Sequence, residues 1–167
     1  MASIKTAYGS SSDLTITLAS LATDANLLAG RESTAVNNTS DLYLDFLLSG
    51  KITTGTSPTA SKEIRIYVYG SYDDTPAYPD VFDGTDSAET VTSSDIRDAG
   101  LKLAAITSTS STSDRTYWFA PVSVASLFGG TLPKYWGVFV THNTGVNLNA
   151  TGSNHDLTIT PVYNTVA

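Results

Sequence analysis

The feature that most restricts the fold of this chain is the alternation of apolar and polar side chains from one residue to the next. The clearest case is residues 62–69, where Ile64, Ile66 and Val68 fall on one side. The opposite side carries Glu63, Arg65, Tyr67 and Tyr69. Successive side chains of a β-strand point to opposite faces, so this pattern predicts a strand with one face in the core and one face outward.

Eight segments of this kind predict an all-β domain. They cover residues 13–21, 27–36, 42–48, 62–69, 101–106, 116–124, 134–142 and 155–163. Gly, Asn, Pro and Ser lie between them and are typical of turns. Eight antiparallel strands in two packed sheets favour a jelly-roll-like sandwich, and other Greek-key sandwiches of similar size stay open.

Some of these strands carry more detailed expectations. The core face of residues 42–48 is expected to hold Leu42, Leu44, Phe46 and Leu48. Residues 134–142 are apolar on both faces, which predicts a central strand. Pro161 has no N–H to give to a neighbouring strand, so we expect a sheet edge or a bulge at its position.

The composition supports strands and turns over helices. The chain has 21 Ser and 25 Thr, and only 15% of its residues are charged. Thr favours half-buried strands, and both hydroxyl residues serve turns. A length of 167 residues fits one hydrophobic core. We therefore expect residues 1–12 to form a polar N-terminal arm and residues 13–167 a single β-sandwich domain.

The charge and the missing cysteines exclude several classes of function. Sixteen Asp and Glu against nine Lys and Arg give a net charge of −7. Nucleic acids and anionic membranes are bound chiefly through Lys and Arg, so neither is an expected partner. Without cysteine there is no disulfide and no thiolate nucleophile. No stretch has the length and hydrophobicity of a signal-peptide core or a membrane span.

Few residues are candidates for catalysis. His142 and His155 are the two histidines, and both follow strands or turns, where exposed polar residues are common. Asp45 lies in an apolar strand, but the alternation places it on the outer face beside Tyr43. The glycine, serine and histidine signatures of common hydrolases and phosphate-binding loops are absent. The sequence therefore predicts a protein that is not an enzyme and has no required cofactor.

The long excursion over residues 71–94 carries the most suggestive acidic cluster. Calcium prefers six to eight oxygen ligands, and Asp80, Asp83 and Asp86 around Gly84 could supply several of them. The spacing differs from the twelve-residue calcium loop of helical sensors. The alternative is a solvated loop or an interaction surface.

Aromatic residues form a second cluster close to this excursion. Its candidate interaction residues are Tyr67, Tyr69, Tyr72 and Tyr78, together with Asp73 and Asp74. Exposed rings serve sugar stacking or protein interfaces, and the interface is favoured here. Tyr67 and Tyr69 share one face of one strand, which a neighbouring protein or the chain's own loop can cover. Trp118 and Trp136 are expected in the core.

The C-terminal stretch LPKYWGVFVTHNTGVNLNATGSNHDLTITPVYNTV, residues 132–166, resembles the end of small β-sandwich proteins from the head-gene modules of tailed phages. In those proteins an aromatic strand leads through an Asn-Thr-Gly turn to a final Thr-rich strand. The segments DLYLDFLLSGKI and KEIRIYVYGSYDD fit the same pattern. The resemblance is to capsid decoration, or cement, proteins, which sit on the outer shell as dimers or trimers and bridge capsid subunits.

The resemblance implies a non-enzymatic virion protein, made in the host cytoplasm, that forms a homo-oligomer, a dimer or trimer, and binds the major capsid protein on the outer capsid surface. The N-terminal arm and the excursion would make the contacts. A carbohydrate-binding module or a phage tail or adhesin domain is the alternative, resting on the tyrosines and the acidic residues. A hydrolase on a jelly-roll scaffold is a third hypothesis, which needs His142 or His155 to act in catalysis.

Overall fold

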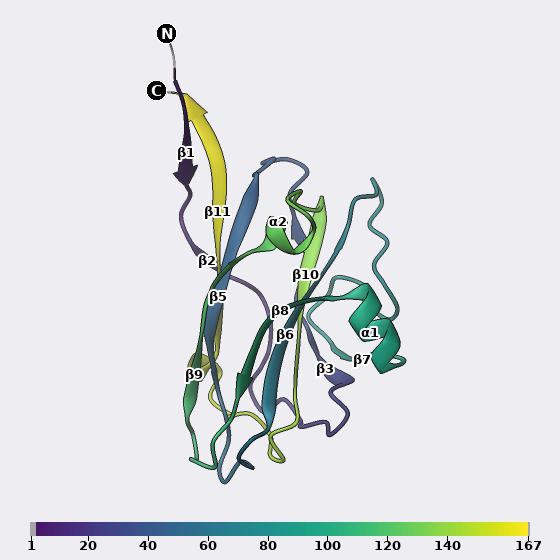
Figure 1. Cartoon of the computed structure of the whole chain (residues 1–167), viewed down its shortest axis with the longest axis vertical. Coiled ribbons are helices and arrows are strands. Elements are labelled where there is room, and N and C mark those ends of the chain that lie inside the picture. Colours follow the sequence, from purple (N-terminus) through teal and green to yellow (C-terminus); the bar gives the residue numbers. More distant parts are fainter. Residues whose placement is uncertain (1–2, 167) are drawn as a thin grey trace.

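The computed structural model describes residues 3–166 and has two antiparallel β-sheets packed face to face (Figure 1). The strands are β1 (Ile4–Tyr8), β2 (Ser12–Asp13), β3 (Ala29–Glu32), β4 (Val36–Asn37), β5 (Asp45–Thr53), β6 (Glu63–Ser71), β7 (Ala88–Thr90), β8 (Lys102–Ser108), β9 (Thr116–Ser123), β10 (Tyr135–His142) and β11 (Asp156–Val166). The helical pieces are α1 (Ser94–Gly100), α2 (Val124–Leu127) and the 3-10 turn η1 (Gly152–Asn154). The predicted all-β sandwich is confirmed.

Each sheet combines strands that are far apart in the sequence. The first, sheet A, has the order β1-β11-β5-β9, with β2 also paired to β11. The second, sheet B, has the order β7-β3-β10-β6-β8, with β4 also paired to β10. The prediction of a central strand at residues 134–142 is confirmed, because β10 has partners on both sides and is almost wholly buried.

The space between the sheets holds the main core. Ile64, Ile66 and Val68 of β6 are at most 1% exposed, as their alternation predicts. Phe46 of sheet A meets Trp136 of sheet B across the interface, with ring centroids 5.3 Å apart. Both aromatic residues belong to the same buried cluster. Burying apolar area of this kind is the main favourable contribution to folding.

Leu42 and Leu44 do not join this core, contrary to the prediction for residues 42–48. Leu42 is 70% exposed and Leu44 is 51% exposed. The strand begins only at Asp45, and the backbone of Leu42 has a positive φ of 53°, which turns the chain. The alternation therefore continues into a turn, where it no longer reports a buried face.

Residues 14–21 form no strand, although a strand is predicted over 13–21. The chain leaves β2 and crosses from sheet A to sheet B. The Leu14 N–H donates to the Leu157 carbonyl of sheet A, at 2.7 Å, and the Thr15 carbonyl accepts from the Thr34 N–H, at 2.9 Å. Leu14 and Leu18 still point into the core. The alternation arises because this segment covers the open side of the sandwich with one face inward.

A second, smaller core lies on the outer face of sheet B. It contains Tyr67, Tyr69 and Phe139 from the sheet, Phe82 and Val91 from the excursion, and Leu101 at the end of α1. Phe82 stacks on Tyr69 with ring centroids 4.7 Å apart. The excursion is thus a packed layer that buries the part of the outer face formed by β6 and β10.

The N-terminal residues are part of sheet A. β1 pairs with the end of β11, from Ile4 opposite Val166 to Tyr8 opposite Val162. Pro161 lies where this pairing is interrupted between β1 and β2, and its carbonyl accepts from the Gly9 N–H at 2.9 Å. The N–H and C=O groups of a strand residue face the same neighbouring strand. The missing N–H of Pro161 therefore faces the gap between β1 and β2.

Candidate binding surface

The two histidines are buried or held in structural hydrogen bonds. His142 has no exposed surface. Its Nε2 donates to the Leu21 carbonyl at 3.1 Å, and its Nδ1 accepts from the Thr144 hydroxyl at 3.0 Å. Burial lowers the pKa of His142 to about 4. This Thr–His pair has the composition of a nucleophile and its base, but Thr144 is also fully buried, so no substrate reaches it.

His155 and Asp45 have structural partners as well. His155 accepts from the Thr53 N–H at its Nδ1, at 3.4 Å, and donates from Nε2 to the Asn149 carbonyl, at 2.8 Å. Burial lowers the pKa of His155. Asp45 is half-buried and accepts from the Ala125 N–H at 2.7 Å, which ties β5 to the start of α2.

The predicted calcium ligands Asp80, Asp83 and Asp86 do not converge. Asp80 accepts from Thr92, Asp83 accepts from Thr85, and Asp86 accepts from Thr17 and Arg31. Within residues 3–166 no three acidic, histidine or cysteine side chains are grouped closely enough to hold a metal ion. The predicted metal site is therefore wrong, because each carboxylate closes a turn or fastens the excursion to another segment.

The Asp86 contact is the strongest of these fastenings. Its carboxylate lies 2.5 Å from Arg31 Nε and 2.6 Å from the Thr17 hydroxyl. Burial raises the pKa of Asp86, but the hydrogen bonds from Arg31 and Thr17 outweigh it and hold that pKa below its usual value. The excursion is thereby joined to β3 and to the crossing segment.

Tyr67 and Tyr69 are wrong as exposed interaction residues. They are 3% and 0% exposed, because the chain's own excursion covers them. Tyr78 is half-buried and meets the Tyr69 ring edge-on, with centroids 5.1 Å apart. Tyr72 stays 47% exposed, and its hydroxyl donates to the Thr131 carbonyl at 2.7 Å. The four tyrosines thus form no common surface.

The two predicted acidic contact residues lie at the start of the excursion. Asp74 is exposed and pairs with Lys134 at 2.6 Å, which lowers the pKa of its carboxyl. The Asp73 N–H donates to Ser71 in a local turn. Both are accessible, but each is occupied within its own chain.

Glu32 is a buried carboxylate that the sequence reasoning did not single out. It has no exposed surface and accepts from the Tyr69 hydroxyl at 2.5 Å and from the Gly84 N–H at 2.6 Å. Burial raises the pKa of Glu32 above its ordinary value, and these hydrogen bonds oppose the shift. A Cβ at Gly137 would overlap the Tyr69 hydroxyl, so this glycine leaves the room for the contact. The cluster holds the second core together.

The most exposed aromatic side chain lies on sheet A. Trp118 of β9 is 74% exposed, so its predicted core position is wrong, whereas that of Trp136 is confirmed. Tyr117 and Phe119 take the inward positions of β9, and the alternation therefore turns Trp118 outward. A run of three aromatic residues in a strand signals this, because at least one of them must face away from the core.

Trp118 begins a row of side chains across the outer face of sheet A. The register places Lys51 opposite Trp118 and Asp156 opposite Lys51. The ammonium of Lys51 lies 5.7 Å from the centre of the Trp118 ring. An aromatic ring, a cation and a carboxylate thus lie side by side on one accessible face.

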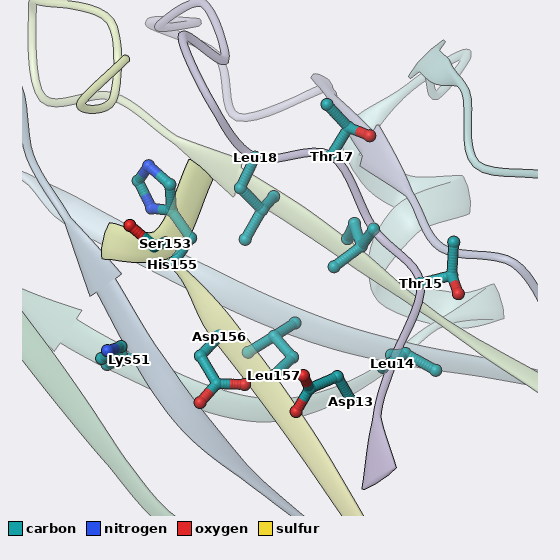
Figure 2. A pocket seen from close by; sticks show the side chains of 11 residues that line it. Asp13, Leu14, Thr15, Thr17, Leu18, Lys51, Ser153, His155, Asp156 and Leu157 are labelled. Atoms are coloured by element: carbon teal, nitrogen blue, oxygen red, sulfur yellow. The ribbon is translucent and has the colours of Figure 1, made fainter. Parts of the chain in front are cut away.

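A groove of about 490 Å³ continues from this row (Figure 2). It lies between the crossing segment and the start of β11, where the two diverge after their pairing at β2. Its lining includes Asp13, Leu14, Thr15, Lys51, Ser153, His155, Asp156 and Leu157. Figure 2 shows Asp13 and Asp156 on neighbouring segments beside Leu157. Lys51 and Asp156 belong to both the row and the groove.

The same face carries exposed apolar side chains at its far end. Val162 and Val166 are six and ten residues beyond Asp156 in β11, so the alternation places them on the face of Asp156. Their partners on β1 are Tyr8 and Ile4, which are 65% and 73% exposed. We call the outer side of sheet A, from Trp118 and Lys51 to Ile4 and Tyr8, the outer A face.

The outer A face has the chemistry of a binding surface. Exposed rings and aliphatic side chains offer apolar contact, and Lys51, Asp156 and Asp13 offer hydrogen bonds at the groove. The hydrogen-bond partners of His155, the groove's histidine, are the Thr53 N–H and the Asn149 carbonyl.

Comparison with family models, with curated proteins and with solved structures finds no match to this chain. None of the helices in residues 3–166 is long and apolar enough to cross a membrane.

Proposed function

We propose that this chain is a non-enzymatic structural protein of a virus particle that binds the outer surface of the capsid through its outer A face. The major capsid protein is the proposed partner, and the bound protein bridges neighbouring capsid subunits. The observation that carries the proposal is the exposure of Trp118, Tyr8 and Ile4 on one sheet face. Trp118 lies at one end of this face and Tyr8 and Ile4 lie at the other, and exposed apolar side chains on one face are typical of a protein interface.

The assignment to a virus shell rests on the resemblance of residues 132–166 to phage decoration proteins. The charge agrees with that role, since a surface protein of net charge −7 has little affinity for the packaged nucleic acid or for anionic membranes. Individual contacts of moderate strength suffice, because repetition over a symmetric shell gives avidity.

The jelly-roll connection pattern is part of the same proposal, and the strand order supports it. Without the short β2, β4 and β7, the first strand pairs with the eighth and the second with the seventh. The third pairs with the sixth and the fourth with the fifth. Such nested pairing is what a long hairpin produces when it folds over into two Greek keys.

The test is sedimentation with capsids assembled without this protein. We expect the wild-type chain to sediment with them and to saturate at a fixed ratio to the capsid subunit. Trp118→Ala should weaken binding at least tenfold, because buried interface tryptophans commonly contribute that much. Tyr72→Ala, at an exposed tyrosine next to sheet B, is the matched control and should bind like the wild type. A wild-type chain left in the supernatant would overturn the proposal.

A second candidate function is binding of a carbohydrate at the Trp118–Lys51–Asp156 row. A flat exposed ring beside polar groups and a groove suits stacking of a sugar ring and hydrogen bonds to its hydroxyls. A glycan array separates the two functions. Saccharide-specific binding that Trp118→Ala abolishes supports the carbohydrate function, and no binding to any glycan removes it.

A further inference from the structure

The terminal strands form a two-stranded ribbon at one end of the molecule. β1 pairs with the last five residues of β11, and four of these lie beyond the end of β5, whose register with β11 stops at Asp45 opposite Val162. Figure 1 shows this ribbon standing clear of the sandwich, with β1 at its outer side. β1 is the edge of sheet A. A second molecule can therefore approach this edge without meeting the body of the domain.

The hydrogen bonds fix which backbone groups of β1 are free. The Gly9 N–H donates to the Pro161 carbonyl, so Gly9 faces β11. Backbone groups of every second residue face the same neighbour, which places those of Ala7 and Lys5 toward β11 too. The N–H and C=O groups of Ile4, Thr6 and Tyr8 consequently point to the open side.

The other edge strands carry features that hinder pairing with a further strand, and β1 carries fewer of them. β9 contains Pro121, β8 is interrupted by a bulge opposite Ile66 and Tyr67, and β7 has only three residues. Proline, bulges and short length are the usual means of preventing edge-to-edge pairing. β1 has five residues, without proline or bulge, and Lys5 is its one charged side chain.

β1 is complementary to itself in the antiparallel direction. With Thr6 opposite the second copy's Thr6, Ile4 lies opposite Tyr8 and Lys5 opposite Ala7. The exposed Ile4 and Tyr8 would then pack as two cross-strand pairs on one face, and no like charges oppose each other. β1 carries no acidic residue, although the whole chain has a net charge of −7, and its two Lys5 side chains would be diagonal neighbours that do not lie directly opposite each other.

We propose that two copies of this chain pair through the free edge of β1, antiparallel and centred on Thr6, and so join their A sheets into one continuous sheet. The interface is isologous, with the same surface contributed by each copy. The inference does not depend on the capsid role, since it concerns the isolated protein.

The first experiment is sedimentation equilibrium of the purified chain over a range of concentrations. We expect a species of twice 17.6 kDa at high concentration. Thr6→Pro removes the outward N–H of both copies and leaves the bonds to β11 intact, so it should raise the dimer dissociation constant at least tenfold. Thr6→Val keeps the N–H and should leave the constant within threefold. A wild-type monomer at every concentration would overturn the proposal.

The second experiment tests the register by cross-linking, because the chain has no cysteine of its own. At the two-fold axis Thr6 faces its own copy with Cα atoms about 5.5 Å apart, a separation that a disulfide spans. Thr6→Cys should therefore oxidise to a covalent dimer. Ala7→Cys is the matched control and should stay monomeric on a denaturing gel, because Ala7 faces Lys5. Equal cross-linking of the two variants, or no cross-link in a Thr6→Cys chain that still dimerises, contradicts this pairing.

Discussion

At the scale of single residues, the buried polar side chains hold this fold in place. Glu32 and His142 have no exposed surface, yet their polar atoms have hydrogen-bond partners. An unpaired polar group in such a position would cost several kcal/mol, which is a large part of the total stability of a typical domain. Their satisfaction makes them structural, and it removes His142 from the list of catalytic candidates.

His142 should make the protein sensitive to acid. Its pKa is about 4 in the folded protein against 6.5 for an unhindered histidine, because burial disfavours the charged ring. Below pH 6.5 the unfolded chain takes up a proton that the folded chain refuses, so stability falls as the pH drops from 6.5 to about 4. The shift corresponds to about 3 kcal/mol of unfolding free energy.

Urea unfolding at about pH 7 and about pH 4 measures this effect. His142→Gln cannot titrate and still offers a donor to the Leu21 carbonyl, so it should lose about 3 kcal/mol less than the wild type between the two pH values. The carboxylates are present in both proteins, and a second comparison in a His155→Gln background removes the electrostatic effect of His155 on the pKa of His142. Identical losses in the two proteins would show that His142 is not the buried neutral group described above.

At the scale of elements, sheet B packs against the main core on one face, and the excursion covers the β6 and β10 part of its other face. Phe82 is the centre of the second core. Its ring stacks on Tyr69 and meets Phe139 edge-on, with ring centroids 5.2 Å apart. Because this cluster is separate from the main core, we expect it to open without unfolding the sandwich.

Phe82→Ala should expose the excursion selectively. Removing a buried phenylalanine costs about 3–5 kcal/mol, and here the loss falls on the second core alone. Hydrogen exchange should accelerate in β7 and around Val91, while β5 and β11 stay protected. Val81→Ala is the matched control, because Val81 is 37% exposed and lies beside Phe82 in the chain. Faster exchange throughout the protein would mean that the two cores unfold as one unit.

The sequence predicted the strands better than it predicted their surroundings. Alternation located β5, β6, β9, β10 and β11, because one face of each is in the main core. It could not show that Tyr67 and Tyr69 are covered. The alternation is the same whether solvent or another segment of the chain lies over the outward face. The same limit applies to Trp118. Both of its neighbours in the sequence are aromatic, so the alternation does not show which face of the strand carries Trp118, and its pairing with Lys51 in the sheet does.

Residues 13–21 show a different limit. Their alternation is real, but it comes from a crossing segment with one face against the core. The alternation of apolar and polar residues indicates which side chains are buried. It does not indicate which backbone groups accept hydrogen bonds from the N–H groups of the segment. For the same reason, spacing could not show that Asp80, Asp83 and Asp86 have separate partners.

At the scale of the whole molecule, the apolar surface is distributed unevenly. The excursion covers sheet B over β6 and β10 and leaves Leu103 and Ile106 of β8 45% and 50% exposed, whereas the outer A face has no such cover and holds Trp118, Tyr8 and Ile4. An open apolar face on an acidic chain is the physical basis for a docking protein. The capsid role uses the face of this sheet and the pairing uses the backbone edge of β1, and the side chains of Ile4 and Tyr8 belong to both surfaces.

The most direct test of the docking role is hydroxyl-radical footprinting of the chain, free and bound to capsids, read out by mass spectrometry. The two tryptophans provide the internal comparison, because Trp118 is 74% exposed and Trp136 is fully buried. Trp118 should be oxidised readily in the free protein and at least several-fold less in the bound protein, with Trp136 protected in both. Oxidation of Trp118 to the same extent in the free and bound states would contradict docking through the outer A face.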